Sequence, residues 1–158
     1  MTAEGFPHLT ATGEARMVDV GGKAPTAREA VATGRLVLSP EAIAALRSGT
    51  VAKGDALGVA RVAGIMATKR VPDLIPLCHQ VALSGVDVAL EVRDADVVIT
   101  VTARTTDRTG VEMEALTGVA VAGLALHDMV KALDPAAVLT DIRLERKTGG
   151  KSGTWTRP

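Results

Sequence analysis

The stretch LSGVDVALEVRDADVVITVTART, residues 83–105, decides the fold of this chain. Apolar side chains alternate with polar or small ones along both of its halves. The apolar positions are Val86, Val88, Leu90 and Val92, and then Val97, Ile99 and Val101. Because successive side chains on a strand point to opposite faces, each half is predicted to be a strand with one buried face. The charged segment between the halves predicts a turn, so the stretch forms a β-hairpin.

Three helices are predicted on the two sides of this hairpin. Ser39 is a good N-cap residue, Pro40 suits the first helical position and Gly49 follows the end, so a short helix lies between them. A second helix follows Asp55, and an apolar helix of about six turns runs over 111–133. Two of these helices precede the hairpin and one follows it. No linker-like segment divides the chain into separate domains.

Two more strands complete the order of elements. Residues 26–38 mix helix and strand signals, with a strand favoured at their end, and residues 137–147 are predicted to be the last strand. The order is then strand, helices, strand, strand, helix, strand. This order predicts an α+β fold of the ferredoxin-like, split βαβ type, with an antiparallel sheet covered on one face by helices.

The length of 158 residues suits one domain with a single core. Residues 1–15 are polar and small and are expected to form a flexible N-terminal arm. Residues 16–158 are expected to form one domain that ends in a flexible tail. Only Phe6 and Trp155 are aromatic, so the core must be built from Ala, Val, Leu and Ile.

Charge and cysteine content exclude several classes of protein. The 18 Lys and Arg residues balance the 18 Asp and Glu residues, so the chain lacks the basic field of a nonspecific nucleic-acid binder. The hairpin also lacks the aromatic residues that stack RNA bases. Cys78 is the single cysteine, which excludes an intrachain disulfide. The N-terminal residues are not an apolar signal, and the uncharged run 115–126 is short for a membrane span, so a cytoplasmic location is expected.

Cys78 and His79 stand side by side in DLIPLCHQ, residues 73–80. They are either packed loop residues or ligands of a small molecule. Neighbours in an extended segment point to opposite faces, which argues against a Cys–His catalytic pair. The chain offers no second cysteine and no histidine at ligand spacing, so no metal site is expected.

Two carboxylates open the long helix, in TGVEMEAL. Thr109 and Glu112 fit the S/T-x-x-E capping box, which gives Glu112 a structural role. Glu114 has no such role. Both carboxylates suit a helix N-terminus, and both could instead accept hydrogen bonds from a purine-like or pterin-like ring.

At the other end of the same helix, Asp128 and Lys131 are three residues apart and within reach of each other. They are a surface ion pair or, if partly buried, a tuned acid and base. The distance from Glu114 to Asp128 along the helix is about 21 Å. No small substrate bridges that distance within one chain, which predicts a symmetric assembly whose sites are shared between copies. The small residues in the middle of the helix would let two helices approach closely.

Near the C-terminus, RKTGGKSG (146–153) resembles a phosphate-binding P-loop only in part. The first glycine of the motif is replaced by Glu145, and too few residues follow for the required helix. The segment is either a solvated end of the chain or an arm whose lysines bind phosphate.

Taken in order, MVDV, KGD, DLIPLCH, TGVEMEALT, DMVKA and GGKSG resemble the cyclic pyranopterin monophosphate synthase family. The resemblance implies a lyase of molybdenum cofactor biosynthesis. Its substrate is a cyclised dihydro-GTP triphosphate, and it releases pyrophosphate without a cofactor. It also implies a ferredoxin-like homohexamer built from dimers, with sites at subunit interfaces, and no nucleic-acid or membrane partner.

By the same resemblance, the catalytic residues are Asp128, Lys131 and Lys53. The substrate-binding residues are Leu77, Cys78, His79, Glu112, Met113, Glu114 and Lys147. The chain departs from the family pattern at Gln80, where proline is usual, and at His127 and Val130, where Tyr and Cys are usual. A non-catalytic ferredoxin-like oligomer that binds a small anionic regulatory ligand is the alternative function.

Overall fold

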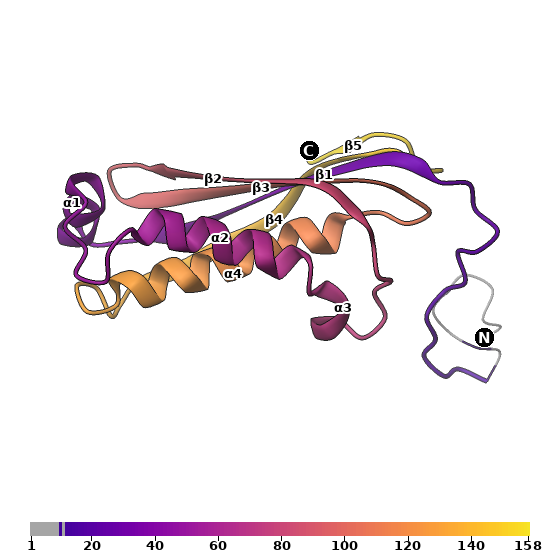
Figure 1. Cartoon of the computed structure of the whole chain (residues 1–158), viewed down its shortest axis with the longest axis horizontal. Helices are drawn as coiled ribbons and strands as arrows, with labels where there is room; N and C mark the ends of the chain where they lie inside the picture. Colours follow the sequence, from indigo (N-terminus) through magenta and orange to yellow (C-terminus); the bar gives the residue numbers. More distant parts are fainter. Residues whose placement is uncertain (1–9, 11) are drawn as a thin grey trace.

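The computed structural model describes residue 10 and residues 12–158, so most of the predicted arm 1–15 lies outside the described residues. The secondary structure consists of five strands and four helices within this part of the chain (Figure 1). In chain order they are β1 Thr26–Val37, α1 Pro40–Ser48, α2 Ala56–Thr68, α3 Val71–Leu74, β2 Leu83–Val92, β3 Asp96–Asp107, α4 Glu112–Val130, β4 Val138–Thr148 and β5 Trp155–Thr156.

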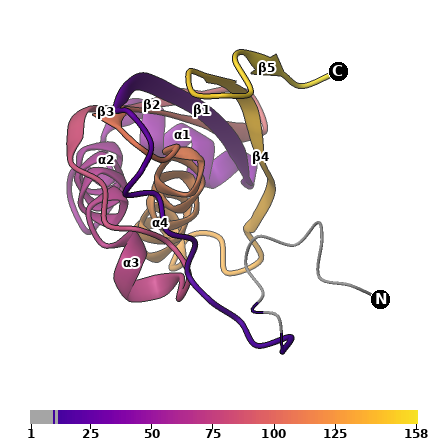
Figure 2. The ribbon, with the colours of Figure 1, turned by 90° about the vertical axis from the view of Figure 1, so that its right-hand side faces the viewer.

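The five strands form one antiparallel sheet in the order β2-β3-β1-β4-β5. β3 therefore lies between β1 and β2, which is the arrangement that defines a split βαβ unit. Figure 2 shows the sheet as one layer of the molecule. Helices α2 and α4 lie side by side against one face of this sheet. The prediction of an α+β fold with helices on one face of an antiparallel sheet is confirmed.

All the predicted elements are present, and two further ones were missed. Pro72, expected only to stop α2, also lies in the first turn of the short helix α3, where proline is well tolerated. The tail beyond β4 turns back, and Trp155 pairs with Lys147 to form the two-residue strand β5. Flexibility of the tail stays a prediction.

The α2–α4 contact explains the small residues of the long helix. A Cβ atom at Gly64 of α2 would lie 3.1 Å from the Cβ of Ala122 and 3.1 Å from the carbonyl oxygen of Gly118. At Gly123 of α4 it would meet the side chain of Leu139 on β4. Gly118, Ala122 and Gly123 thus serve packing inside one chain, and the inference that the small residues bring two copies together stays a prediction.

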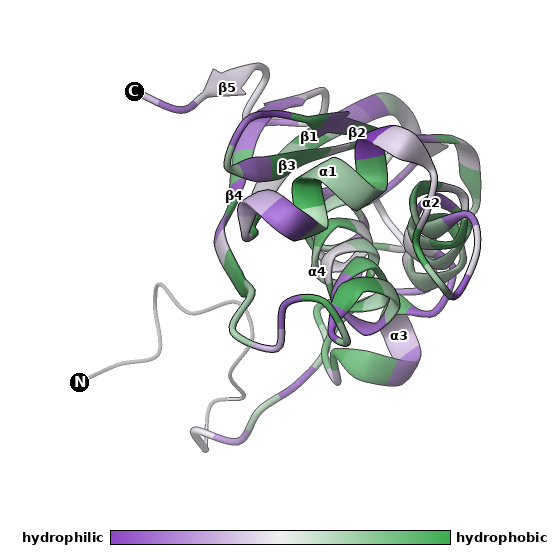
Figure 3. Cartoon of the chain, turned by 90° about the vertical axis from the view of Figure 1, so that its left-hand side faces the viewer, coloured by the Kyte–Doolittle hydropathy of each residue, from purple (hydrophilic) through white to green (hydrophobic). Residues whose placement is uncertain are grey.

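α4 is, in the described part of the chain, the one helix long and apolar enough to cross a membrane. Half of its apolar stretch is buried inside the protein, with Val119, Ala122 and Leu126 fully covered. Figure 3 shows this mostly apolar helix beside α2 and against the sheet. This is the packing of a core helix.

Strand β4 carries two irregularities in its pairing with β1. At the second of them Leu144 pairs with Ala32 and Arg146 pairs with Val31, which leaves Glu145 as an extra residue. An extra residue in a strand exchanges the faces to which the following side chains point. As a result Lys147 pairs with Ala30, a core residue, and its side chain lies on the helix side of the sheet.

Candidate active site

A cavity of about 400 Å³ lies at the start of α4. Its walls come from three places in the chain: the segment before β1, the loop before β2 and the first turn of α4. The lining residues are Val18, Val20, Lys23, Leu77, Cys78, His79, Val81, Thr109, Gly110, Glu112, Met113 and Glu114. The structure therefore brings together six of the seven predicted substrate-binding residues.

The seventh, Lys147, does not line the cavity itself but contacts Glu112 in its wall from β4. Its Nζ atom lies 3.1 Å from Oε1 of Glu112. The carboxylate of Glu112 also folds back over Gly110, where a Cβ atom would clash with it. The predicted capping box is wrong, because the N-cap position is Val111 and no side chain caps the helix. Glu112 pairs with a distant lysine instead.

Glu114 is a buried carboxyl group in the wall of this cavity, with 4% of its surface exposed. Burial raises its pKa, and the nearby charge of Glu112 adds to the increase. Burial also raises the pKa of the Cys78 thiol, with a further contribution from Glu114. A thiol held protonated is a poor nucleophile, which agrees with the argument against Cys–His catalysis.

His79 fixes the segment that precedes β1 across the mouth of the cavity. Its Nε2 atom lies 2.6 Å from the carbonyl oxygen of Val18. This contact brings Val20 and Lys23 to the cavity as well. The sequence prediction missed these residues, although the motif MVDV and the lysine after Gly21 and Gly22 were visible signals.

A cluster of charges lies at the other end of α4. Nζ of Lys53 is 2.7 Å from Oδ2 of Asp128 and donates to the Asp128 carbonyl oxygen, also at 2.7 Å. Nζ of Lys131 is 2.7 Å from Oδ1 of the same carboxylate. Hydrogen bonds from Lys131 and Lys53 lower the pKa of Asp128 from 3.8 to about 2. In the single chain Asp128 and Lys131 are about half exposed, at 56% and 55%, so the partial burial considered from the sequence is not found.

The KGD motif has a structural explanation at this end. Gly54 has φ 96°, a backbone conformation that favours glycine, and its N–H bonds to the carbonyl oxygen of Val51. Asp55 is the N-cap of α2 and accepts a hydrogen bond from the N–H of Gly58 at 2.8 Å. The turn and the cap together hold Lys53 directly before α2, beside Asp128.

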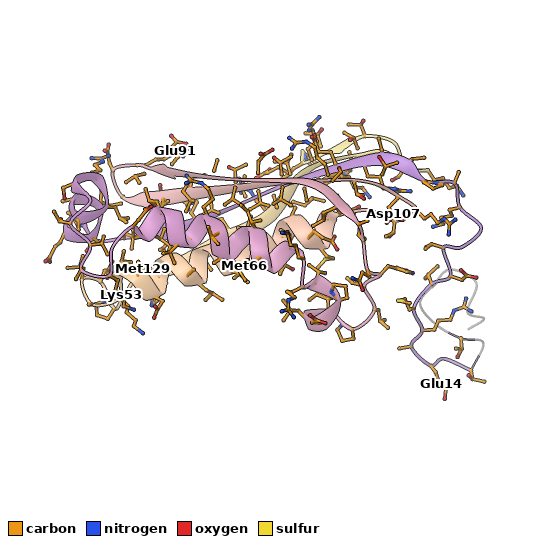
Figure 4. The ribbon with its side chains drawn as sticks, viewed as in Figure 1. Glu14, Lys53, Met66, Glu91, Asp107 and Met129 are labelled. Atoms are coloured by element: carbon orange, nitrogen blue, oxygen red, sulfur yellow. The ribbon has the colours of Figure 1, made fainter. Side chains whose placement is uncertain are left out.

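The two groups of candidate residues lie at opposite ends of the molecule. α4 runs along its long axis (Figure 1), and Figure 4 shows Lys53 near Met129, far from the start of α4. With an α-helical rise of 1.5 Å per residue, Glu114 and Asp128 are separated by about 21 Å. One chain thus carries a carboxylate-lined cavity and a separate cation cluster. No group of three His, Cys, Asp or Glu residues suited to a metal ion occurs among the described residues.

The fold and these two groups define a class: a ferredoxin-like α+β protein with a carboxylate-lined cavity at one end of α4 and a pair of lysines around a carboxylate at the other. Comparison with known proteins is more specific. A family model described as the MoaC family matches residues 17–150. The chain belongs to the MoaC family.

Relatives with a named activity cover almost the whole chain. The cyclic pyranopterin monophosphate synthase of Streptomyces coelicolor is 61% identical over 150 residues, which are 95% of this chain and 88% of the relative. The synthase of a Nocardioides species is 62% identical, with 96% and 94% of the two chains covered. That of Peptoclostridium acidaminophilum is 49% identical, with 96% and 97% covered.

The function is therefore that of an enzyme, a cyclic pyranopterin monophosphate synthase in molybdenum cofactor biosynthesis. The resemblance drawn from the sequence is confirmed. The alternative, a non-catalytic regulatory binder, loses its support.

Proposed function

We propose that the substrate of this chain is a cyclised dihydro-GTP triphosphate and that the products are cyclic pyranopterin monophosphate and pyrophosphate. The observation that carries this proposal is the division of the candidate site. One end of α4 offers carboxylates and an imidazole beside a cavity, and the other offers two lysines around a carboxylate. A ring rich in N–H groups fits the first end, and a triphosphate fits the second.

The phosphorus chemistry requires positive charge. An oxygen of the sugar-derived part attacks the α-phosphorus, a new P–O bond forms, and the bond to the leaving pyrophosphate breaks. Negative charge collects on the pyrophosphate as this happens. Lys53 and Lys131 are the cations that stabilise it, in the way that positioned lysines assist phosphoryl transfer in general.

The ring chemistry requires proton transfers and a fixed orientation. Opening the purine-derived ring and closing the pterin ring moves protons on and off nitrogen and oxygen atoms. His79, Glu112 and Glu114 bind the ring system from the cavity, and Lys147 is held next to them by Glu112. Asp128, Lys53 and Lys131 supply the catalytic acid and base groups. They become available when the substrate replaces some of the contacts between the Asp128 carboxylate and the two lysines.

A second copy of the chain completes the site. Two chains related by a two-fold axis can place the start of one α4 beside the end of the other, which removes the separation of about 21 Å. This arrangement also sets the acidic helix start of one chain against the lysines of its partner. An uncovered apolar surface on the helix side supports such a contact, with Val59, Val62 and Met66 of α2 between 46% and 60% exposed. We propose a homohexamer built from such dimers, acting in the cytoplasm.

Turnover of the cyclised GTP intermediate tests the proposed reaction, with pyrophosphate release as the measurement. Lys53→Ala and Asp128→Ala are each expected to lower turnover by about 100-fold or more, because the removed groups act on the reacting atoms. Arg93→Ala, which removes an exposed cation paired with Glu91 in the hairpin, is the matched control and should retain wild-type turnover. Near wild-type rates in both site variants would refute the assigned roles.

A further inference from the structure

A second hollow lies behind Glu114. It has a volume of about 240 Å³ and is lined by Thr68, Lys69, Pro72, Gln80, Val81, Leu83 and Glu114. Glu114 and Val81 also line the larger cavity at the start of α4, so these two residues form a shared wall. Glu114 thus lines both spaces.

The two spaces differ in what surrounds them. The front cavity holds the groups assigned to the substrate ring. The rear hollow has exposed polar residues, Lys69 and Gln80, and buried Thr68 and Glu114. Its volume is several times the roughly 30 Å³ that one water molecule occupies, and its polar groups can hydrogen-bond to water. The Thr68 hydroxyl donates to the carbonyl oxygen of Ile65 at 2.8 Å and keeps its lone pairs as acceptors.

Glu114 is suited to carry a proton. In the described part of the chain its carboxyl group has no side-chain partner, unlike Glu112, which is paired with Lys147. Burial raises the pKa of Glu114, so the neutral acid persists to higher pH than in an exposed glutamate. The titratable groups around it are Glu112 on α4, Cys78 and His79 in the loop before β2, Lys69 after α2 and Lys23 before β1.

We propose that Glu114 passes protons between solvent and the reaction cavity, with the rear hollow as the route to solvent. The neutral carboxyl group donates its proton to a nitrogen of the opened ring, so an N–H bond forms as the O–H bond breaks. The carboxylate then takes a proton from water in the rear hollow, and that water regains one from solvent. No electrons are gained or lost in this step. The proposal rests on the proposed function, because only a reaction with repeated proton transfers needs such a route.

Gln80 contributes a polar side chain to this route. It is exposed and lines the rear hollow, where its amide can donate and accept hydrogen bonds. An apolar mouth would leave water there with fewer partners.

The test is a double variant, Lys69→Met with Gln80→Leu, which makes the mouth of the rear hollow apolar and leaves the front cavity unchanged. We expect kcat with the cyclised GTP intermediate to fall by about 10-fold while KM stays within about 2-fold of wild type. Raising the concentration of a small buffer acid such as imidazole should restore the rate, because it replaces the missing proton donor. Arg70→Met is the matched control, since Arg70 neighbours Lys69 but lines neither space.

An unchanged kcat in the double variant overturns the proposal, and so does a fall in kcat that buffer does not restore. An independent measurement is the infrared carbonyl band of the neutral Glu114 carboxyl group followed with pH. The band should persist to higher pH than the bands of exposed glutamates, because burial raises the pKa of Glu114, and it should be absent in Glu114→Gln. Loss of the wild-type band at the pH at which exposed glutamates ionise also overturns the proposal. If the wild type fails to turn over the intermediate, the proposed function fails, and the infrared measurement still reports on Glu114.

Discussion

Asp128 shows how strongly two lysines can act on one exposed carboxylate. Its folded-state pKa of about 2 lies below the ordinary 3.8, so its ion pairs contribute to stability above pH 3.8. That contribution is lost as the pH falls through about 2. At neutral pH the group is fully ionised, and it becomes a useful acid or base only when substrate changes its surroundings.

Removing either lysine should raise the pKa of Asp128, because the charged form loses a hydrogen-bond donor. Lys131→Met is expected to have the larger effect and Lys53→Met the smaller, in the order of their hydrogen-bond contributions. A carboxyl ¹³C NMR titration measures the shift, with Lys151→Met as control. A value that stays at about 2 in Lys131→Met contradicts the assignment.

Single residues also show what sequence alone can predict. Chemical type and local spacing were enough to pick out Glu114, Asp128 and Lys131 as candidates. They gave no sign that Lys53 contacts Asp128, since 75 residues separate the two and only the fold joins them. Glu112 was predicted to cap its own helix because Thr109, three residues earlier, completes the sequence pattern of a capping box. The partner it has, Lys147, lies 35 residues further along the chain.

At the level of elements, the short turn before α2 controls the position of Lys53. Gly54→Ala should destabilise the protein by about 1–2 kcal/mol, because a side chain at φ 96° is strained. It should also lower turnover by displacing Lys53. Gly49→Ala is the matched control: Gly49 has φ 68° at the end of α1, so a similar loss of stability is expected without a loss of turnover. Urea unfolding and pyrophosphate release are the two measurements, and unchanged turnover in Gly54→Ala would count against this role.

Strand and helix predictions succeeded where a long pattern covered a whole element. The hairpin of β2 and β3 and the helix α4 have such patterns, each over 10 residues or more. Helix α3 has four residues and β5 has two, which is too short for any periodicity to appear. The split βαβ type followed from the order of strands and helices along the chain. Few antiparallel sheets with this order let α2 and α4 cover the same face.

At the scale of the whole molecule, the proposal that each site is shared between two chains can be tested by mixing variants. Lys53→Ala and His79→Ala chains are each expected to be inactive, because each lacks one half of the site. In a randomly mixed population of two-fold dimers, about a quarter of the sites combine two intact halves, so about a quarter of wild-type turnover should return. The chains must be mixed under conditions that exchange subunits.

The control for this experiment uses two variants in the same half. Lys53→Ala mixed with Asp128→Ala leaves every site with one defective cation cluster, so turnover should stay low. Equal recovery in both mixtures, or none in either, would show that the site is not divided between chains.

The extra residue in β4 has a consequence for how this protein can change over time. Lys147 faces Glu112 only because Glu145 shifts the strand by one position. Substitutions along the strand do not change the number of residues between Leu144 and Lys147. A single insertion or deletion there would turn the Lys147 side chain to the opposite face of the sheet. This segment should therefore accept many replacements of side chains but no change in length. Strand length here is as much a part of the site as the residues that line it.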